Sequence, residues 1–494
     1  MECRFVRLTF SGPVPAFSLS AWRVAYEWVD GDSSFTSSNA TLNAVYDLCR
    51  YTLFSASLDT YTDSNTRERT PYEADGLIAA SGRLLVQREY MFPRHSHAFV
   101  LQTPTWPLEW KMLTPFLAWQ DFFATGQPDL ALSFEQRLHN STMLVLLENS
   151  TGLLRTDNTG SLGSHILDWM PDGNESDQTI ARGEFTNSTH FSVTNALSAR
   201  GLDLLSRLMA AGGRAASAVQ YGAEAAALTA AIDRLMWNAS ASAFCDGICS
   251  DVDGNSRLMT SMYFLALGLS AQLHGAAAAD AAWQRVADWG IESIGAYGAF
   301  WWQLAVAGSY YSSAPAYYAP DDGAAIVTAL TKCDTFSWCS GLRDDNLTMT
   351  RESWHDGTYS HGWGSSPLTG VAYGIMGVHE LSPGWASFSV KPKLGPLIFA
   401  NGTTPSIRGF IVVAATPGAV EVGVPCNSKA TLCAPRSSSD GPTPFSAATH
   451  RLFLNDVEVV GPVESSGHLC LPRAVGCSAG GAVWRLRIEP RAAQ

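Results

Sequence analysis

Residues 61–75 read YTDSNTRERTPYEAD and carry four acids and two arginines. Charged residues make up only 16% of the whole chain, so this stretch stands apart from its surroundings. Charges interleaved with Tyr and Pro do not suit an ordinary amphipathic helix. They favour the mouth of a site that binds a polar, uncharged ligand through many hydrogen bonds. A carboxylic acid among carboxylates and arginines can be tuned for general acid catalysis, although a salt-bridged surface loop would have the same composition.

The length and composition indicate a globular protein of several domains. A chain of 494 residues, 46% of them hydrophobic, is too long for one simple core. The net charge of −13 and the total of only 32 Lys and Arg residues argue against a nucleic-acid partner. The longest apolar runs, such as residues 299–307, are shorter than the roughly 20 residues that cross a bilayer. We therefore expect no membrane span and interpret these runs as buried helices.

The cysteines favour an oxidising compartment. Eight of the ten fall in close sequence pairs, which leaves Cys3 and Cys49. The pairs are Cys245 and Cys249, Cys333 and Cys339, Cys426 and Cys433, and Cys470 and Cys477. Such spacings are compatible with small disulfide loops, and the last two pairs could each close a hairpin, although spacing alone leaves the connectivity open. None of the pairs has the spacing of a zinc site.

Eight N-x-S/T sequons favour the same compartment. They lie at Asn39, Asn140, Asn149, Asn174, Asn187, Asn238, Asn346 and Asn401. Because disulfides and N-glycosylation both belong to the secretory route, we predict a glycoprotein that is secreted or held in the secretory-pathway lumen. The N-terminus lacks a basic segment followed by an apolar stretch of signal-peptide length. We therefore expect a signal peptide upstream of this chain.

Changes in periodicity along the chain predict three regions. Residues 1–34 alternate weakly in polarity, and we interpret them as the remnant of an N-terminal β-module and a linker. Residues 35–380 have helical periodicity, with apolar side chains spaced along one helix face at residues 197–208 and a Gly-Gly stop signal soon afterwards. In residues 381–494 the period changes to two and Gly/Pro turns separate the runs, which predicts antiparallel β-structure.

A second cluster of acids and aromatics occupies residues 348–364, which read TMTRESWHDGTYSHGWG. Glu352 stands there between an arginine and two tryptophans, with His361 nearby. Asp168-Trp169 is a third pairing of an acid with an aromatic residue. Aromatic faces can stack on sugar rings, and carboxylates bind hydroxyl groups. Two separated acids in such surroundings fit glycosidic bond cleavage, in which one acid protonates the leaving oxygen and the other acts on the opposite face of the sugar.

The alternative for each cluster is structural, with tryptophans buried in the core and acids that cap helices. This alternative is weaker for three clusters in one chain than for one. His95 and His97 could ligate a metal, and residues 251–255 resemble half of a calcium loop, but that loop lacks its closing Glu. We therefore predict no metal site. Phosphate-binding and dinucleotide-binding motifs are also missing from the sequence, so no cofactor is expected.

The clusters together resemble the motifs of the α-L-rhamnosidase family of glycoside hydrolases. In that family a motif of the type Asp-x-x-x-Arg-(Asp)-Glu-Arg, followed by an aromatic residue and an Asp, opens the helical domain. The matching residues here are Asp63, Arg67, Glu68, Arg69, Tyr72 and Asp75. A later Glu-x-Trp and Ser-His-x-Trp pattern is matched by Glu352, Trp354, Ser360, His361 and Trp363. Asp168-Trp169 also has a family counterpart, and the resemblance extends from about Phe35 to the C-terminus.

The resemblance implies a multidomain α plus β protein, with an (α/α)6 barrel as catalytic domain over residues 35–380 and a C-terminal antiparallel β-sandwich. It implies an inverting hydrolase that removes terminal α-L-rhamnosyl residues from a carbohydrate or glycoside without a cofactor. Glu68 would be the general acid, and Glu352 the general base that activates water. The side chains that would bind the sugar are Asp63, Arg67, Tyr72, Asp75, Asp168, Trp169, Trp354, His361 and Trp363.

The chain departs from the family pattern close to the expected acid. Ser64-Asn65 replace the Cys-Pro that often follows the first Asp, and Tyr72 stands in place of a Trp. Glu73 adds a charge near the site. Two alternatives stay open: a related glycosidase that acts on another sugar, and a catalytically silent carbohydrate-binding protein on the same scaffold. Both expected catalytic acids are present, which favours an enzyme.

Overall fold

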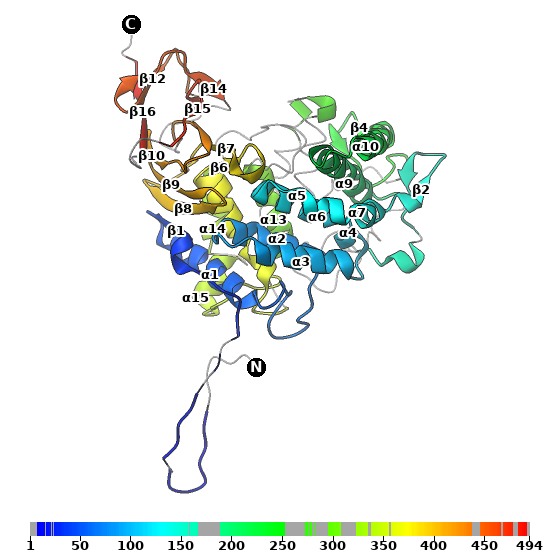
Figure 1. Cartoon of the computed structure of the whole chain (residues 1–494), viewed down its shortest axis with the longest axis horizontal. Coiled ribbons are helices and arrows are strands. Elements are labelled where there is room, and N and C mark those ends of the chain that lie inside the picture. The colour runs from blue at the N-terminus through cyan, green and yellow to red at the C-terminus, as the bar shows by residue number, and fades with distance from the viewer. Residues whose placement is uncertain are drawn as a thin grey trace.

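The computed structural model consists of a helical body and a C-terminal sheet domain (Figure 1). It describes residues 7–14, 16–20, 22, 24–157, 159–165, 188–251, 272–275, 277–278, 281, 295–307, 323–333, 337–354, 357–436, 445–465, 468–477 and 483–491. The first described residues, up to about residue 22, extend away from the body (Figure 1). The predicted order, helices first and strands afterwards, is confirmed.

The helices of the body follow one another between residues 40 and 369. Their bounds are α1 (Ala40–Ala56), α2 (Glu73–Leu84), α3 (Met91–Gln102), α4 (Leu108–Lys111), α5 (Thr114–Thr125), α6 (Asp129–Ser133), α7 (Glu135–Ser141), α9 (Ser192–Ala211), α10 (Ala215–Met236), α13 (Gly295–Ala307), α14 (Gly323–Thr331), α15 (Trp338–Asp344) and α16 (Pro367–Thr369). Two short hairpins lie among them, β2 (Leu147–Glu148) with β3 (Leu153–Leu154), and β4 (Trp237–Asn238) with β5 (Ala243–Phe244). Within the described ranges, no helix is both long enough and apolar enough to cross a membrane.

Helices α9 and α10 form a hairpin (Figure 1), and α9 confirms the helix face predicted for residues 197–208. The α9 leucines Leu197, Leu204 and Leu208 are fully buried, and α9 packs on α5 as well as on α10. Gly213 in the turn has a φ of 75°, a left-handed conformation that glycine adopts without strain. Each buried leucine contributes about 1.5–3 kcal/mol relative to an exposed one, so this face holds the hairpin to the body.

The larger sheet of the C-terminal domain has the strand order β1-β8-β9-β10-β16-β12-β13 in the described residues. The strands are β1 (Ser34–Ser37), β8 (Ala400–Ser406), β9 (Gly409–Thr416), β10 (Ala419–Gly423), β16 (Trp484–Pro490), β12 (His450–Leu454) and β13 (Val457–Glu458). All neighbours in this order are antiparallel. Side chains alternate as predicted: Ile411 and Val413 of β9 are buried, whereas Phe410 and Val412 are exposed.

A smaller sheet in the order β11-β7-β6 packs beside the body. Its strands are β6 (Val378–Glu380), β7 (Ser387–Val390) and β11 (Lys429–Leu432), and a separate hairpin joins β14 (Val463–Ser465) to β15 (His468–Cys470). Strands β7 and β11 are parallel, a departure from the expected all-antiparallel arrangement. This pairing is possible because β8, β9 and β10 lie between them in sequence and bring the chain back in the same direction.

Strand β1 connects the two parts of the molecule. It precedes α1 in sequence but pairs with β8 of the C-terminal sheet, and its Phe35 side chain is buried. Helix α1 begins after two intervening residues, with the Asn39 side chain accepting a hydrogen bond from the Leu42 backbone N–H at 3.0 Å. The start of the helical body is therefore fixed to the sheet domain.

The disulfides agree with the sequence pairs in the body and differ from them in the sheet domain. Cys245–Cys249 and Cys333–Cys339 are bonded as close pairs. In the sheet domain, Cys426 is bonded to Cys477, and Cys433 to Cys470. The hairpin closures that the spacing suggested, 426 with 433 and 470 with 477, are therefore wrong. The reason is the strand pairing, because residues 430–434 and 469–475 lie alongside each other and bring these cysteines together.

Candidate active site

The site is built where two loops far apart in sequence lie side by side. One connects α1 to α2, and the other leads into the short helix Gly362–Ser365. The Gly362 backbone N–H donates to the Asp63 carbonyl at 3.1 Å. The Asn65 backbone N–H donates to Ser360 Oγ at 3.2 Å across a sequence separation of 295 residues. The two charged clusters of the sequence therefore meet at one place.

The Arg67 guanidinium joins the two predicted catalytic carboxylates. Its Nη1 lies 2.7 Å from Glu68 Oε1. Its Nη2 donates to Glu352 Oε1 and Oε2 at 2.8 and 2.9 Å. Charge-assisted hydrogen bonds of this length are among the stronger polar interactions in proteins. Glu68 and Glu352 thus share one cation and lie at one site.

Glu352 is the more enclosed of the two glutamates. Its side chain is 5% exposed, compared with 35% for Glu68. Glu352 Oε2 accepts hydrogen bonds from the Thr358 backbone N–H at 2.8 Å and from Thr358 Oγ1 at 3.2 Å. The Trp363 indole donates to the Glu352 carbonyl at 2.8 Å. Arg67 and Thr358 therefore fix the orientation of the carboxylate, and Trp363 fixes the backbone of the same residue.

Glu68 lies at the more open side of the site and is held by Tyr72. The Tyr72 hydroxyl donates to Glu68 Oε2 at 2.7 Å, while Arg67 occupies Oε1. Tyr72 immediately precedes α2 in an extended conformation, and its ring packs edge-on against Trp110 with centroids 5.3 Å apart. The start of the helix therefore places the phenol next to the carboxylate.

Two further acids, Asp63 and Asp75, lie buried behind the glutamates. Asp63 Oδ1 accepts from the Thr70 backbone N–H at 2.8 Å, but Asp63 Oδ2 and both Asp75 oxygens have no hydrogen-bond partner among the described residues. Burial raises the pKa of Asp75 well above its usual value, and the charges of Asp63 and Glu352 raise this pKa further. Burial also raises the pKa of Asp63. Such unpartnered oxygens are suited to hydrogen bonding with the hydroxyl groups of a ligand.

His361 completes this buried group. Its Nδ1 lies 3.4 Å from Asp75 Oδ1, and its ring packs on Trp363 with centroids 4.2 Å apart. Burial lowers the pKa of His361 well below its usual value, and the charge of Arg67 adds to this effect. The imidazole is therefore neutral at physiological pH, so it can either donate or accept a hydrogen bond.

An aromatic group lines the same region. Trp110 lies edge-on to Trp363 at 6.1 Å, and Tyr297 lies 5.5 Å from Trp363 between ring centroids. Trp110 and Tyr297 did not emerge from the sequence. Tyr297 lies in an apolar stretch, and Trp110, although Glu109 directly precedes it, belongs to none of the three clusters. Trp354 was predicted as a sugar-binding residue, but it is buried and packs edge-on against Trp338 at 5.0 Å.

The remaining predicted residues have separate surroundings. Arg69 donates through Nε to the Asn65 carbonyl at 2.6 Å and closes the loop. Glu73 was expected to add a charge near the site, but its buried carboxylate accepts from the Thr105 backbone N–H at 2.9 Å on the loop after α3. Asp168-Trp169 lie outside the described residues.

Glu109, the neighbour of Trp110 on α4, binds a histidine that sequence analysis did not single out. His165 Nδ1 lies 2.5 Å from Glu109 Oε1, and His165 Nε2 lies 2.7 Å from the Thr156 carbonyl. Burial lowers the pKa of His165, but the hydrogen bond and charge of Glu109 outweigh burial, so this pKa lies above its usual value. The pair links the aromatic side of the site to the β2–β3 hairpin.

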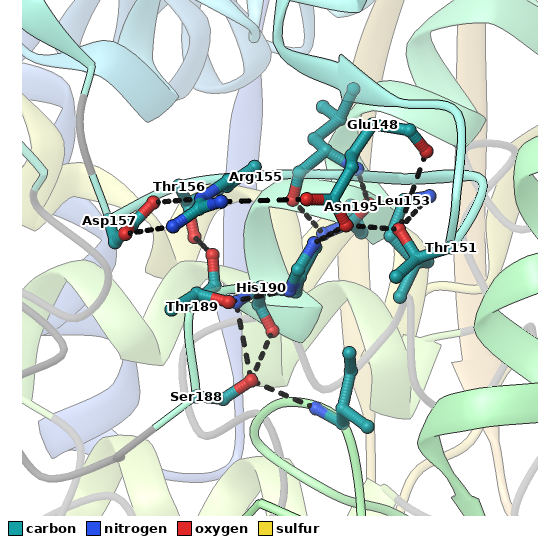
Figure 2. A network of polar contacts seen from close by, with 12 residues as sticks. Glu148, Thr151, Leu153, Arg155, Thr156, Asp157, Ser188, Thr189, His190 and Asn195 are labelled. Atoms are coloured by element: carbon teal, nitrogen blue, oxygen red, sulfur yellow. Dashed lines mark hydrogen bonds and ion pairs between the residues drawn. The ribbon is translucent and has the colours of Figure 1, made fainter.

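Figure 2 shows how the polar network continues from this hairpin. The Thr156 backbone N–H donates to the Thr189 carbonyl at 2.7 Å, and His190 Nε2 lies 3.2 Å from Glu148 Oε2. The Leu154 backbone N–H donates to Oδ1 of Asn195, a residue of α9, at 2.7 Å. These contacts fix the hairpin to the start of α9.

The two histidines that could have bound a metal do not share one face. His95 is exposed on α3, whereas His97 is buried, with neither ring nitrogen hydrogen-bonded in the described structure. Among the described residues no group of three or more His, Cys, Asp or Glu side chains is placed to hold a metal ion. Of the calcium-like stretch only Asp251 is described.

A helical body with facing carboxylates and aromatic walls is an arrangement typical of glycosidases. Residues 30–296 match the model of the bacterial alpha-L-rhamnosidase 6 hairpin glycosidase domain, and residues 377–443 match the bacterial alpha-L-rhamnosidase C-terminal domain. The first match covers more than half of the chain. The chain therefore belongs to the bacterial α-L-rhamnosidase family of six-hairpin glycosidases, as the resemblance implied.

Solved structures have the same fold. The α-L-rhamnosidase from Dictyoglumus thermophilum superposes with a TM-score of 0.70 at 14% identity, over 94% of this chain and 51% of that chain. The Streptomyces avermitilis α-L-rhamnosidase complexed with L-rhamnose gives 0.67 at 16% identity, over 93% and 42%. The native enzyme from Aspergillus terreus gives 0.62 at 16% identity, over 81% and 48%. This chain thus spans about half the length of these relatives. A comparison with curated protein sequences gave no match.

Proposed function

We propose that the protein is a glycoside hydrolase that cleaves terminal α-L-rhamnosyl residues by an inverting acid/base mechanism. Glu68 is the general acid and protonates the glycosidic oxygen as its bond to the anomeric carbon breaks. Glu352 is the general base and removes a proton from the water that attacks the opposite face of that carbon. The products are the free sugar with inverted configuration and the alcohol of the leaving group.

The observation that carries this proposal is the bridge through Arg67. Hydrogen bonds of 2.7 and 2.8 Å to one guanidinium limit the separation of the bonded Glu68 and Glu352 oxygens to roughly 8 Å. Inverting enzymes separate their carboxyl groups by about 6.5–9.5 Å, and retaining enzymes by about 5–5.5 Å. The limit admits the inverting range, and the anomer released first distinguishes this range from the retaining one.

The surroundings of the two glutamates fit their proposed roles. Glu352 is buried and held by Thr358 and Arg67, as suits a base that must orient one water molecule. Glu68 is more exposed, as suits an acid that must reach the oxygen of a leaving group. Asp63 and Asp75, with unpartnered buried oxygens, would bind the sugar hydroxyls.

The choice of sugar follows from family membership and from the Streptomyces avermitilis relative, whose structure contains L-rhamnose. We test it with a panel of 4-nitrophenyl glycosides that includes the α-L-rhamnoside, the β-D-glucoside and the α-L-arabinoside. We expect the α-L-rhamnoside to be hydrolysed at least about 100-fold faster than the others, because a sugar that leaves buried polar groups unpaired is strongly rejected. Faster hydrolysis of another glycoside would identify a related glycosidase, and no hydrolysis of any would favour a silent binding protein.

Proton NMR of the first product formed tests the stereochemistry. We expect the anomer opposite to that of the substrate before mutarotation mixes the two forms. Initial release of the same anomer would show a retaining mechanism and remove Glu352 from the role of base.

We further propose a secretory location, which the disulfides and the sequons support. Asn140, Asn149 and Asn401 are exposed and open to modification. Expression through a eukaryotic secretory pathway should give a glycoprotein whose mass falls on treatment with an N-glycosidase. An unchanged mass would contradict the glycosylation.

A further inference from the structure

Glu68 has two partners of different chemistry among the described residues. Arg67 Nη1 contacts Oε1 at 2.7 Å, and the Tyr72 hydroxyl contacts Oε2 at 2.7 Å. A guanidinium group can only donate hydrogen bonds, whereas a phenol can donate one and accept others. The two oxygens of this carboxyl group are therefore not equivalent.

This difference decides where a proton can lie on Glu68. A proton on Oε1 would meet an N–H group of Arg67, which offers no lone pair. A proton on Oε2 meets the hydroxyl oxygen of Tyr72, which can accept it. When Glu68 is ionised, the same hydroxyl turns its own hydrogen towards Oε2.

We infer that Tyr72 is a positioning residue for the general acid, which directs the transferable proton to Glu68 Oε2 and holds that oxygen towards the leaving group. The inference rests on the proposed function of Glu68. In the catalytic step the Oε2–H group turns from the Tyr72 oxygen to the glycosidic oxygen and transfers its proton there, and the phenol then donates its hydrogen to the carboxylate that remains. Tyr72 ends the cycle unchanged, so protons balance.

The position of Tyr72 suits this role. Its ring is fixed by Trp110 and by the start of α2, so the hydroxyl cannot move far from Glu68. Burial raises the pKa of Tyr72, the hydrogen bond and charge of Glu68 raise it further, and a hydrogen bond from Trp106 opposes this in part. The phenol thus keeps its proton across the working pH range.

Two substitutions distinguish hydrogen-bond donation by the Tyr72 hydroxyl from hydrogen-bond acceptance. Tyr72→Phe removes both the donor and the acceptor, and Tyr72→Trp supplies an indole N–H that can only donate. Tyr221→Phe is the matched control, because its hydroxyl donates to Glu135 at 3.1 Å in the α7–α10 region, away from the site. All three keep an aromatic ring, and thermal unfolding verifies that each variant folds.

The readouts are the pH profile of kcat/KM and its dependence on the leaving group. The substrates are 2,4-dinitrophenyl α-L-rhamnoside, which needs little protonation, and phenyl α-L-rhamnoside, which depends on it. For Tyr72→Phe we expect a loss of about tenfold or more on the phenyl substrate and less than about twofold on the dinitrophenyl substrate. The alkaline limb of the profile should move up by about 0.5–1 pH unit, because the ionised carboxylate loses a donor.

Tyr72→Trp should lose activity on the phenyl substrate as well, but its alkaline limb should move to lower pH. Tyr221→Phe should match the wild type on both substrates. Equal losses on both substrates with an unmoved limb, in either Tyr72 variant, would show that Tyr72 only packs and would overturn the inference. Such a result would overturn only the inference about Tyr72, and not the proposed function, if the wild type hydrolyses both rhamnosides and Glu68→Gln selectively loses activity on the phenyl substrate. A wild type that hydrolyses neither rhamnoside overturns the proposed function together with it.

Discussion

At the residue scale, the site gathers four carboxyl groups, of which two contact the Arg67 guanidinium. Arg67 forms ion pairs with Glu68 and Glu352. Asp63 and Asp75 are left without a cation at hydrogen-bonding distance in the described structure. A buried acid beside other acids resists ionisation, so Asp75 is held in its neutral form over a wider pH range than an exposed aspartate. A neutral Asp75 can donate to a sugar hydroxyl as well as accept from one.

Replacing Asp75 by Asn should stabilise the fold and impair function. A raised pKa in the folded state means that Asp75 favours folding below the pKa of the unfolded chain, and that this contribution is lost as the pH rises through the folded pKa. Asn resembles the neutral acid at every pH. We expect the unfolding midpoint of Asp75→Asn to exceed that of the wild type by a margin that grows from pH 5 to pH 8, while kcat/KM on the rhamnoside falls about tenfold or more.

The matched control is Asp30→Asn, whose carboxylate is 97% exposed and should leave both quantities unchanged. An Asp75→Asn protein that is less stable than the wild type at pH 8 would show that the carboxylate is a structural partner.

Sequence reasoning reached the charged residues of the site because each lies in a dense local cluster. Asp63 and Glu352 belong to different clusters; the chemistry of glycosidic cleavage suggested that acids of separate clusters act together, and the family resemblance assigned them to one site. The aromatic residues Trp110 and Tyr297 could not be found in this way, because an aromatic side chain at a site and one in the core look alike in sequence. Trp354 is buried and packs on Trp338, and its assignment to sugar binding stays a prediction.

At the element scale, the segment of residues 159–165 is held against α4 by the buried pair of His165 and Glu109. Both ring nitrogens of His165 face acceptors, the Glu109 carboxylate and the Thr156 carbonyl. Only the imidazolium form donates through both nitrogens, so the charged form of His165 fits this arrangement. The contact fixes residues 159–165 to α4, whose Trp110 lines the site.

Raising the pH should therefore loosen residues 159–165. The pKa of His165 is raised on folding, so its stabilisation is fully present below its unfolded pKa of about 6.5 and is lost as the pH rises through the folded value. We expect backbone hydrogen exchange in this segment, corrected for its intrinsic pH dependence, to be roughly ten- to 100-fold less protected at pH 9 than at pH 6.

His165→Gln should abolish that pH dependence, whereas His95→Gln, at an exposed position on α3, should preserve it. Constant protection from pH 6 to pH 9 in the wild type would contradict a role for the imidazolium.

At the scale of the whole molecule, the sheet domain is held together by contacts between distant parts of the chain. Strand β1 precedes the helical body in sequence but pairs with β8 of the sheet that follows the body. The two disulfides of the domain span 51 and 37 residues. Bonds that close loops of this length restrict the unfolded chain more than hairpin bonds of seven residues would, by the entropic model. Periodicity predicted the strands, but it could not predict cysteine pairing, which depends on which strands lie side by side.

Trypsin can test this connectivity directly, because each of the four cysteines falls in a separate peptide. Cys426 lies in residues 409–429, Cys433 in 430–436, Cys470 in 452–473 and Cys477 in 474–485. Without reduction we expect 409–429 linked to 474–485, and 430–436 linked to 452–473. Links between 409–429 and 430–436 would restore the hairpin closures. Replacing both Cys433 and Cys470 by Ser should lower the unfolding free energy by about 4 kcal/mol.

The most direct test of the central claim is the turnover of 4-nitrophenyl α-L-rhamnoside by the wild type, Glu68→Gln and Glu352→Gln, each shown to fold by circular dichroism. General acid and base groups typically contribute about 10²–10⁴-fold each. We predict that the wild type hydrolyses this substrate and that both variants lose at least 100-fold in kcat. Variants that keep more than a tenth of the wild-type rate would contradict a shared catalytic role for these two glutamates.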